Sequence, residues 1–292
     1  MRTILIDNIS NQKESEELRS IVSKDYPEIK VYKSNGFGQI PGIISKIIQR
    51  KPEIIISAGG DGTINNIINN LMKSNKDQIK NIKLSVIHGG KANDLARILE
   101  IPKDTKQALK QILKGKSRKI DLIKVNQKYF ITGGGFGLPA HIIKLKNKGG
   151  IFNFMKDSLY LLLVLKSFIF GYQKVEIIKI NNTKRNNLML VSVMNQDFIG
   201  KRFFLNPEAK NNDGTLNICL IKDSFNIFKR FYRLNKVINK EHKNHSWSEF
   251  MKFEKMKISL DKKTYFMADG ELLELSKEFN FSVIPKALNF IS

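Results

Sequence analysis

The chain has 292 residues, of which 41% are hydrophobic, and it carries a formal net charge of +23. This length allows one large domain or two ordinary ones, and the hydrophobic fraction is enough for a packed core. A single cysteine, Cys219, excludes an intrachain disulfide scaffold and favours a reducing compartment. The charge indicates an anionic partner, either nucleic acid, a membrane surface or a polyanionic substrate, although a general abundance of lysine explains part of it.

Short apolar runs alternate with helical patterns from the N-terminus to about Gly115. The runs predict strands at Thr3–Ile6, Ile29–Tyr32, Glu53–Ser57 and Lys83–Ile87, and helices at Glu14–Ser23, Gln39–Gln49, Ile64–Met72 and Asn93–Leu113, the last broken at Pro102. This alternation is typical of a doubly wound α/β domain with a parallel sheet. We place the domain at residues 1–118, which the C-terminal segment 284–292 could complete. Because the chain enters a strand directly, we expect no signal peptide.

Strand-like runs follow one another through turns after Ile120 and predict an antiparallel second domain at residues 119–283. The strands are expected at Asp121–Val125, Lys128–Thr132, Glu176–Ile180, Leu188–Val193, Leu216–Ile221, Lys257–Leu260, Thr264–Ala268 and Phe279–Val283. A helix is predicted at Ile151–Phe170, where charged residues favour a buried or interfacial helix over a membrane span. A second, basic and amphipathic helix at Phe225–Lys243 either lies on an anionic bilayer or packs its phenylalanines on the domain.

A glycine-rich turn, Ser57–Thr63, links the third predicted strand to a helix. Glycine lets the backbone approach an anion closely, and the N–H groups of the first helical turn attract it. Asp61 would repel a phosphate unless it holds Mg²⁺ or orients water and a catalytic group. Two further loops, Ser34–Gly38 and Gly89–Gly90, follow other strands of this sheet. Ligands of parallel sheets bind beyond the carboxyl ends of the strands, so the three loops predict a nucleotide and metal site.

Three other motifs carry polar side chains whose role the residues alone leave open. Asn93 or Asp94 could cap the helix that follows the second glycine turn, or face the nucleotide. The segment Asp269–Glu271 is typical of a hairpin turn, but its two carboxylates could also supply a general base. Asp213 is part of either a turn or a cation site completed by loop carbonyls. The sequence has no Walker A or nucleophile-elbow motif and no histidine–cysteine cluster with metal-ligand spacing.

Together these motifs resemble the diacylglycerol kinase catalytic-domain family, and most closely its soluble bacterial lipid kinases of the diacylglycerol kinase or sphingosine kinase-like type. The resemblance runs essentially end to end and rests on Gly59-Gly60-Asp61-Gly62-Thr63, Asn93-Asp94-Leu95-Ala96-Arg97, Pro207-x-Ala209 with Asp213-Gly214, and Asp269-Gly270-Glu271. The first motif is shared with NAD kinases and phosphofructokinase-like enzymes. The second and the last, in this order, favour a lipid acceptor.

The resemblance implies a NAD kinase-like α/β domain followed by an antiparallel β-sandwich, with the active site in the cleft between them. It implies ATP binding through Asn8, Ser34, Gly59, Gly60, Asp61, Gly62, Thr63, Asn65, Asn66, Gly90 and Asn93. It also implies a catalytic network of Asp61, Asp94, Asp269 and Glu271, in which Asp269 or Glu271 is the base. A second, structural Mg²⁺ would be held by Asp213 and by the carbonyls of Lys210 and Thr215.

Some positions differ from the usual family pattern. The first loop, Asp7–Gln12, lacks a proline and a glycine, Asn66 stands in place of a glutamate, and Lys91 replaces a threonine. These differences leave the phosphate donor open, and they leave two alternatives: a kinase of a soluble acceptor such as NAD, and an inactive nucleotide- or lipid-binding protein.

Because the four acidic positions are present, we expect an active ATP- and Mg²⁺-dependent lipid kinase. Its substrate would be diacylglycerol or a related long-chain alcohol such as a sphingoid base. We expect it in the cytoplasm, peripherally bound to an anionic membrane. No recognition motif or aromatic stacking platform favours nucleic acid, and exposed strand edges of a sandwich would allow a homodimer.

Overall fold

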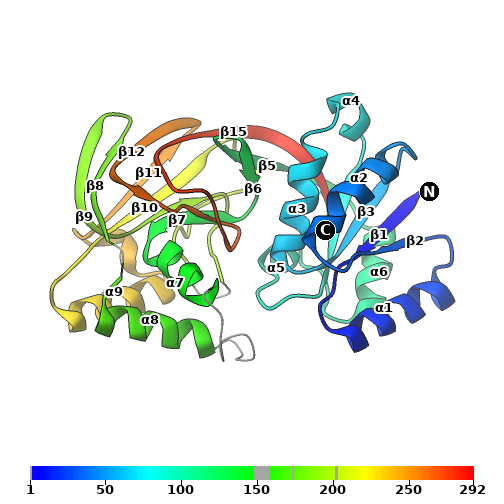
Figure 1. Cartoon of the computed structure of the whole chain (residues 1–292), viewed down its shortest axis with the longest axis horizontal. Coiled ribbons are helices and arrows are strands. Elements are labelled where there is room, and N and C mark those ends of the chain that lie inside the picture. The colour runs from blue at the N-terminus through cyan, green and yellow to red at the C-terminus, as the bar shows by residue number, and fades with distance from the viewer. Residues whose placement is uncertain (1, 148–157, 173, 201–202) are drawn as a thin grey trace. The chain divides into compact units, whose positions relative to one another are not determined.

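The computed structural model describes residues 2–147, 158–172, 174–200 and 203–292 (Figure 1). The chain divides into two compact units, of which the first comprises Met1–Asp121 with Lys286–Ser292 and the second Leu122–Pro285. The expected architecture, an α/β unit followed by an antiparallel β unit, is confirmed. The domain limits expected from the sequence remain predictions, and the structural division runs after Asp121 and after Pro285.

The first unit is built on a parallel sheet in the order β2-β1-β3-β4-β15. Its strands are β1 (Thr3–Asp7), β2 (Lys30–Lys33), β3 (Ile54–Gly59), β4 (Lys83–His88) and the end of β15 (Ser276–Ile291). Every residue of β1 and β3 is buried, which is why these strands are continuous apolar runs rather than alternating ones. Level pairing of Asp7 with Ala58, and of Gly59 with His88, brings the loops that follow these strands to one edge of the sheet.

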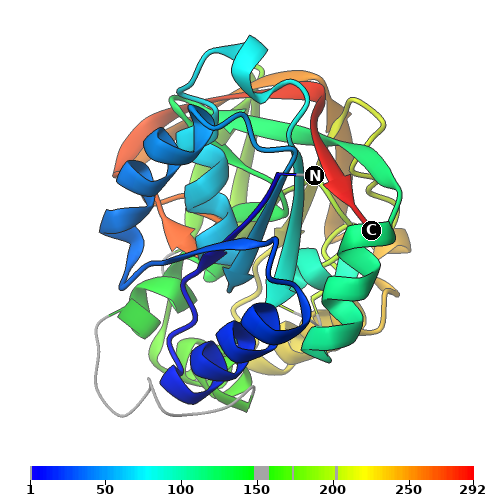
Figure 2. The same ribbon diagram turned by 90° about the vertical axis from the view of Figure 1, so that its right-hand side faces the viewer.

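Helices cover both faces of this sheet (Figure 2). On one face lie α1 (Gln12–Asp25) and α6 (Thr105–Lys114), and on the other α2 (Ile40–Ile48) and α3 (Asp61–Leu71). Two shorter helices, α4 (Lys76–Ile79) and α5 (Asp94–Ile98), and the 3-10 turn η1 (Phe37–Gln39) complete the unit. The predicted helix Asn93–Leu113, broken at Pro102, corresponds to α5 and α6, and Asp104 caps α6 by accepting from Gln107 N at 2.8 Å.

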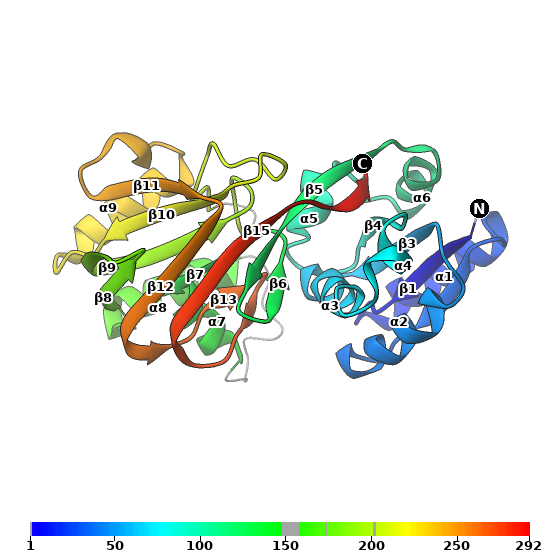
Figure 3. The ribbon, with the colours of Figure 1, turned by 90° about the horizontal axis from the view of Figure 1, so that it is seen from above.

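The second unit is an antiparallel β-sandwich in which long strands contribute to both layers (Figure 3). Strand β9 (Thr183–Met194) pairs through its first half with β8 (Val175–Ile180), and through its second half with β7 (Gly133–Gly137). Strand β12 (Lys255–Thr264) pairs with β8, and β15 pairs with β12. Strand β5 (Ser117–Val125) pairs with β15, and β6 (Lys128–Phe130) pairs with β5. On the β7 side lie β13 (Met267–Ala268) and β14 (Glu271–Leu272), while β10 (Leu216–Lys222) and β11 (Ser248–Phe253) extend from β9.

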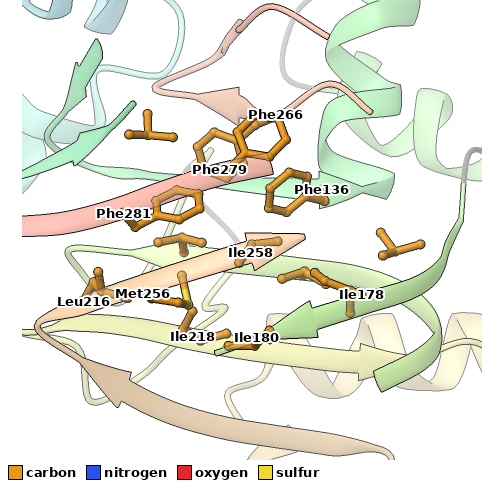
Figure 4. Packing of buried hydrophobic residues seen from close by; sticks show 14 of the residues in the cluster. Phe136, Ile178, Ile180, Leu216, Ile218, Met256, Ile258, Phe266, Phe279 and Phe281 are labelled. Carbon is orange, nitrogen blue, oxygen red and sulfur yellow. The ribbon is translucent and has the colours of Figure 1, made fainter. Parts of the chain in front are cut away.

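Aromatic and branched side chains fill the space between the layers (Figure 4). The ring centroid of Phe136 lies 4.8 Å from that of Phe266 and 5.0 Å from that of Phe279, and Phe281 lies 5.1 Å from Phe266. Ile258 and other aliphatic residues pack against the four rings. This core anchors β13, the strand that leads directly into Asp269.

Helices cover the outer face of β9 and β10, where a second apolar cluster includes Leu190, Cys219 and Ile221. They are α7 (Leu138–Asn147), α8 (Ser158–Phe170), α9 (Ile227–Ile238) and the 3-10 turn η3 (His242–Asn244). Helix α7 was not predicted. Residues 151–157 of the predicted helix Ile151–Phe170 lie outside the described residues. No helix in the described part of the chain is long and apolar enough to cross a membrane.

Candidate active site

The two glycine turns of the first unit pack directly against each other. A Cβ atom on Gly90 would lie 2.4 Å from the Cα of Gly60, and one on Gly89 would lie 2.9 Å from the Cα of Gly59. A Cβ on Gly59 would also lie 2.4 Å from the hydroxyl oxygen of Thr63. Glycine is required here because backbone meets backbone. Gly60 occupies the N-cap position of α3 and has no side chain that could accept from the first N–H groups of the helix.

Asp61 joins the two turns. One oxygen of its carboxylate accepts a hydrogen bond from the backbone N–H of Leu95, 3.2 Å away in the first turn of α5. Asp94, the residue before Leu95, is buried and lies 3.8 Å from the guanidinium of Arg97. The structure therefore brings the acidic positions 61 and 94 to neighbouring helix ends of the same sheet edge.

Asn93 does not cap α5, contrary to one of the two roles considered for it. It adopts a left-handed backbone with φ of 51°, and its side-chain oxygen accepts from Gly90 N at 3.0 Å. Its amide nitrogen donates to the carbonyl of Gly90 at 2.7 Å. Asn93 thus closes its own turn through Gly90. The carboxylate that accepts from the first turn of α5 is that of Asp61, in the other glycine turn.

The other predicted nucleotide residues of the first unit also bind protein groups. The amide of Asn8 donates to the hydroxyl of Thr63 at 3.0 Å, which ties the loop after β1 to the glycine turn. Ser34 is buried and donates to the carbonyl of Gly36 at 2.7 Å. Asn65 and Asn66 face the next turn of α3, where they accept from Asn69 and Asn70 at 2.9 and 2.8 Å. Of these bonds, that of Asn8 joins two of the predicted ATP loops, whereas those of Ser34, Asn65 and Asn66 stay within one loop or helix.

Asp269 and Glu271 form a tight hairpin between β13 and β14. Asp269 and Gly270 have φ values of 46° and 81°, the left-handed pair that an Asp-Gly hairpin turn requires. Asp269 is buried, and its carboxylate accepts from four donors of the segment Ile131–Gly133. One oxygen accepts from Ile131 N at 2.9 Å, and the other from Thr132 N at 2.9 Å, the Thr132 hydroxyl at 2.5 Å and Gly133 N at 3.3 Å.

Glu271, two residues on, has a different environment. Its side chain is exposed, yet its pKa is raised above the ordinary value. The first cause is partial removal of the carboxylate from water, and the second is the negative charge of Asp269. Lys128 and Lys146 act in the opposite direction. The hairpin thus presents one carboxylate that is bound by the scaffold and one, that of Glu271, that reaches solvent and has a pKa above that of an ordinary glutamate.

The predicted metal site at Asp213 lies in the loop before β10. One oxygen of Asp213 accepts from the backbone N–H of Thr215 at 3.0 Å and from its hydroxyl at 2.7 Å, and the other lies 3.9 Å from the ammonium of Lys252. Gly214 has φ of 74°, as a turn requires. A carboxylate with loop carbonyls, such as that of Lys210, is chemically suited to Mg²⁺. Among the described residues, no group of three or more histidine, cysteine or acidic side chains is placed to hold a metal.

Comparison with known proteins places the chain in a family. Residues 6–125 match the profile of the diacylglycerol kinase catalytic domain, and residues 140–292 match that of the YegS C-terminal NAD kinase beta sandwich-like domain, which alone covers more than half of the chain. This chain belongs to the diacylglycerol kinase and YegS-like family of lipid kinases. The family membership inferred from the motifs is confirmed.

Individual lipid kinases of this family are moderately similar to the chain. The diacylglycerol kinase of Bacillus subtilis (strain 168) is 29% identical over 231 residues, which are 76% of this chain and 72% of that protein. The diacylglycerol kinase of Staphylococcus aureus (strain JH9) is 26% identical over 250 residues, 84% of this chain and 76% of the relative. A crystal structure of a diacylglycerol kinase from Bacillus anthracis (strain Sterne) has a TM-score of 0.77 at 23% identity, covering 99% of this chain and 96% of the other. The likeness of the structures shows a shared fold.

Sequence reasoning missed the residues that position Asp269 in this lipid kinase. Thr132 provides two of the four donors to its carboxylate, but it lies 137 residues earlier in the chain and belongs to no motif that we identified. Asp7 was also overlooked as a buried anchor of the first loop. It accepts from the hydroxyl of Ser15 at 2.6 Å and from Ile9 N at 3.2 Å. An acidic residue that ends a wholly apolar strand is the signal that could have indicated Asp7.

Proposed function

We propose that this family member is an ATP- and Mg²⁺-dependent kinase that phosphorylates a hydroxyl group of diacylglycerol or a related lipid at a membrane surface. The observation that carries the proposal is the close packing of the two glycine turns, Gly59–Gly60 and Gly89–Gly90, the first of which leads directly into α3. The hydrogen bond from the Leu95 N–H to Asp61 links α5 to the first turn. Phosphoryl transfer requires a phosphate cradle, a cation and a proton acceptor, and little covalent chemistry by the protein. The names of the relatives support a lipid as the acceptor.

The first unit would hold the triphosphate through backbone groups. The first-turn N–H groups of α3 and the positive end of its dipole are suited to a phosphate. Gly60 and Gly90 leave this backbone accessible, because a side chain at either position would enter the other turn. Asp61 and Asp94 would supply carboxylate oxygens to Mg²⁺, which when bound neutralises charge on the phosphates. The side chains of Asn8 and Asn93 would act indirectly, by fixing the loops.

Glu271 is the proton acceptor that the geometry favours over Asp269. The protein already holds both carboxylate oxygens of Asp269: one accepts from Ile131 N, and the other accepts three hydrogen bonds from Thr132 and Gly133. Glu271 reaches solvent, and a raised pKa brings a general base closer to the operating pH. In the proposed step the lipid hydroxyl oxygen bonds to the γ-phosphorus, the bond from that phosphorus to the departing ADP oxygen breaks, and the hydroxyl proton moves to Glu271. Asp269 would position the hairpin.

Asp213 would hold the second, structural Mg²⁺ together with the carbonyls of Lys210 and Thr215. The ammonium of Lys252, which lies 3.9 Å from the carboxylate, would have to move away, because the metal ion would replace it as the positive charge beside Asp213. Binding would then stabilise the folded protein according to the free metal concentration. Thermal unfolding with EDTA and with millimolar Mg²⁺ tests this site. A melting temperature that rises with Mg²⁺ in the wild type but not in Asp213→Asn supports it, and equal responses of the two proteins contradict it.

Transfer of labelled phosphate from γ-labelled ATP tests the function itself. The acceptors would be diacylglycerol, monoacylglycerol, ceramide and sphingosine in anionic mixed micelles, with NAD as a soluble acceptor. Label in an organic-extractable product, lost in Glu271→Gln, is the expected result. Label only with NAD would indicate a soluble acceptor, and no label in any reaction despite ATP binding would indicate an inactive nucleotide-binding protein.

A further inference from the structure

Apolar side chains are exposed together at the end of α8 and the start of α9. In the described part of the chain eight large hydrophobic side chains are exposed, and five of them form what we call the aromatic rim: Ile169, Phe170, Phe225, Phe228 and Tyr232. Phe225 is 90% exposed, and Phe170 and Phe228 are each 79% exposed. Single exposed hydrophobic residues are common, but a group of this kind marks an interaction surface.

The two helices that carry the rim are tied to each other. The ring of Phe168 on α8 lies 5.1 Å from that of Phe231 on α9, and Figure 1 shows the helices side by side. Between them the buried carboxylate of Asp223, just before α9, binds three side chains, those of Tyr172, Lys174 and Arg230. The distances are 2.7 Å to the Lys174 ammonium and 2.9 Å to Nε of Arg230. The end of α8 and the start of α9 therefore form one fixed surface.

Helix α9 buries its aliphatic residues and leaves its first aromatic residues in solvent. Leu234 and Val237 pack in the cluster below the helix, whereas Phe228 and Tyr232, one turn apart, are exposed. The sequence offered two alternatives, a helix packed through its phenylalanines and a helix on a bilayer. The structure shows α9 packed through one face, with Phe231 in the cluster, and leaves the aromatic side chains of the other face exposed.

Basic side chains surround the rim. Besides the buried Arg230 of α9, five basic residues lie on α8, on α9 or at the end of β10: Lys166, Lys222, Lys229, Arg233 and Lys236. The ammonium of Lys174 lies 5.0 Å from the ring of Phe225. Asp223 is the one acidic residue in the described parts of segments 162–174 and 222–238, and it is buried against Lys174 and Arg230. An apolar centre with a mostly cationic margin, in which Glu241 pairs with Lys236, matches the acyl and headgroup regions of an anionic bilayer.

We propose that the aromatic rim inserts into an anionic lipid bilayer and docks the enzyme on the surface that contains its substrate. This inference rests on the proposed lipid kinase function and adds to it the element that makes the contact. Aromatic side chains would enter the boundary between headgroups and acyl chains, while the surrounding lysines and arginines remain at headgroup level. A helix anchored along one face is suited to this, because it lies in the plane of the interface and does not cross the membrane.

Co-sedimentation with vesicles tests the inference. The wild type should bind vesicles of phosphatidylcholine with 30% phosphatidylglycerol, and bind pure phosphatidylcholine far more weakly. The double variant Phe225→Ser/Phe228→Ser should bind the anionic vesicles at least about tenfold more weakly, because it lacks the two phenyl groups that the wild type would transfer from water into the bilayer. Lys229→Gln should weaken binding by on the order of fivefold, and only at low salt. Leu275→Ser, an exposed apolar residue outside the rim, is the matched control and should bind as the wild type.

Activity measurements separate this inference from the proposed function. The double variant should retain wild-type turnover of a monomeric short-chain diacylglycerol and lose turnover of long-chain diacylglycerol in vesicles. Vesicle binding that depends on the rim, in a protein that phosphorylates no lipid, would support docking and refute the kinase proposal. Unchanged vesicle binding by the double variant, in a protein whose wild type phosphorylates lipid, would overturn docking alone. A wild-type dimer that the double variant converts to monomers, with vesicle binding unchanged, would show that the rim binds a second copy and would also overturn it.

Discussion

Substitutions in the β13–β14 hairpin should separate catalysis from scaffolding. In Glu271→Gln the side chain keeps its size but can no longer accept the hydroxyl proton, so we expect kcat to fall about 10²- to 10⁴-fold. Because the side chain is exposed, the free energy of unfolding should change by less than about 0.5 kcal/mol. The fold and ATP binding should therefore be retained while turnover is lost.

Asp269→Asn should instead lower stability, by an amount that the hydrogen bonds allow us to estimate. If the asparagine oxygen takes the position that accepts from Thr132 and Gly133, the amide nitrogen must face the N–H of Ile131. Losing a hydrogen bond to a charged group costs about 1.5–3 kcal/mol, and a buried donor without a partner costs about 1–3 kcal/mol more. For a unit of this size the two together correspond to a melting temperature lower by on the order of 10 °C.

Thermal unfolding by circular dichroism and turnover of micellar lipid, measured on both variants, check this assignment. The expected result is a large stability loss in Asp269→Asn and a large turnover loss without instability in Glu271→Gln. The reasoning is refuted if Glu271→Gln turns over at the wild-type rate while Asp269→Asn is inactive and melts with the wild type. Asp269 would then be the base, and its four hydrogen bonds would not prevent it from taking the proton.

Three further predictions concern pH, the glycine turns and Asp223. Because the pKa of Glu271 is raised, kcat/KM should fall with decreasing pH around a midpoint above the ordinary glutamate value of about 4.3, and this limb should vanish in a pH–rate profile of Glu271→Gln. Gly90→Ala places a Cβ 2.4 Å from the Cα of Gly60 and should cost about 1–3 kcal/mol and weaken ATP binding in calorimetry, whereas Gly42→Ala, with open space around it in α2 and outside the three loops, should not. Asp223→Asn should cost about 3–5 kcal/mol in urea unfolding at pH 7. Burial alone would raise the pKa of Asp223, but hydrogen bonds from its partners lower it, so the wild type should lose the part of its stability that depends on the Asp223 charge as the pH falls below about 3.9 through the lowered pKa.

The first unit was predictable because its signals are local. A buried parallel strand must be apolar along its whole length, and Ile54–Ser57 shows this without reference to the rest of the chain. Gly59 and Gly60 directly follow that strand and mark the turn by their own conformational freedom. Strand order could not be read in this way, but any order of parallel strands brings their carboxyl ends to one edge. The location of the glycine turns was therefore predictable before their contacts were known.

Features that depend on distant parts of the chain could not be predicted. Asp269 receives its hydrogen bonds from residues that precede it by 136 to 138 positions, and no local pattern relates the two segments. Helix α7 was missed because it starts after the glycines of β7 and carries Pro139, both signals of a turn. Proline is in fact tolerated in the first turn of a helix, where its missing N–H has no partner to lose. The aromatic rim could not be predicted because the sequence does not show which face of α9 packs on the protein. The burial of Leu234 and Val237 in the structure identifies that face.

In the proposed function, the motif side chains and the atoms that would bind the phosphates are not the same set. Asn8, Asp61 and Asn93 stand in the loops that the sequence indicates for the nucleotide, yet the structure binds each of them to another loop or to its own turn. In the proposed function a phosphate would therefore bind the backbone N–H groups at the start of α3, which no substitution of a side chain removes. Changes at these positions would therefore act on phosphate binding through the shape of the turns. In the proposed mechanism the same division recurs at the hairpin, where Asp269 builds the turn and Glu271 would accept the proton.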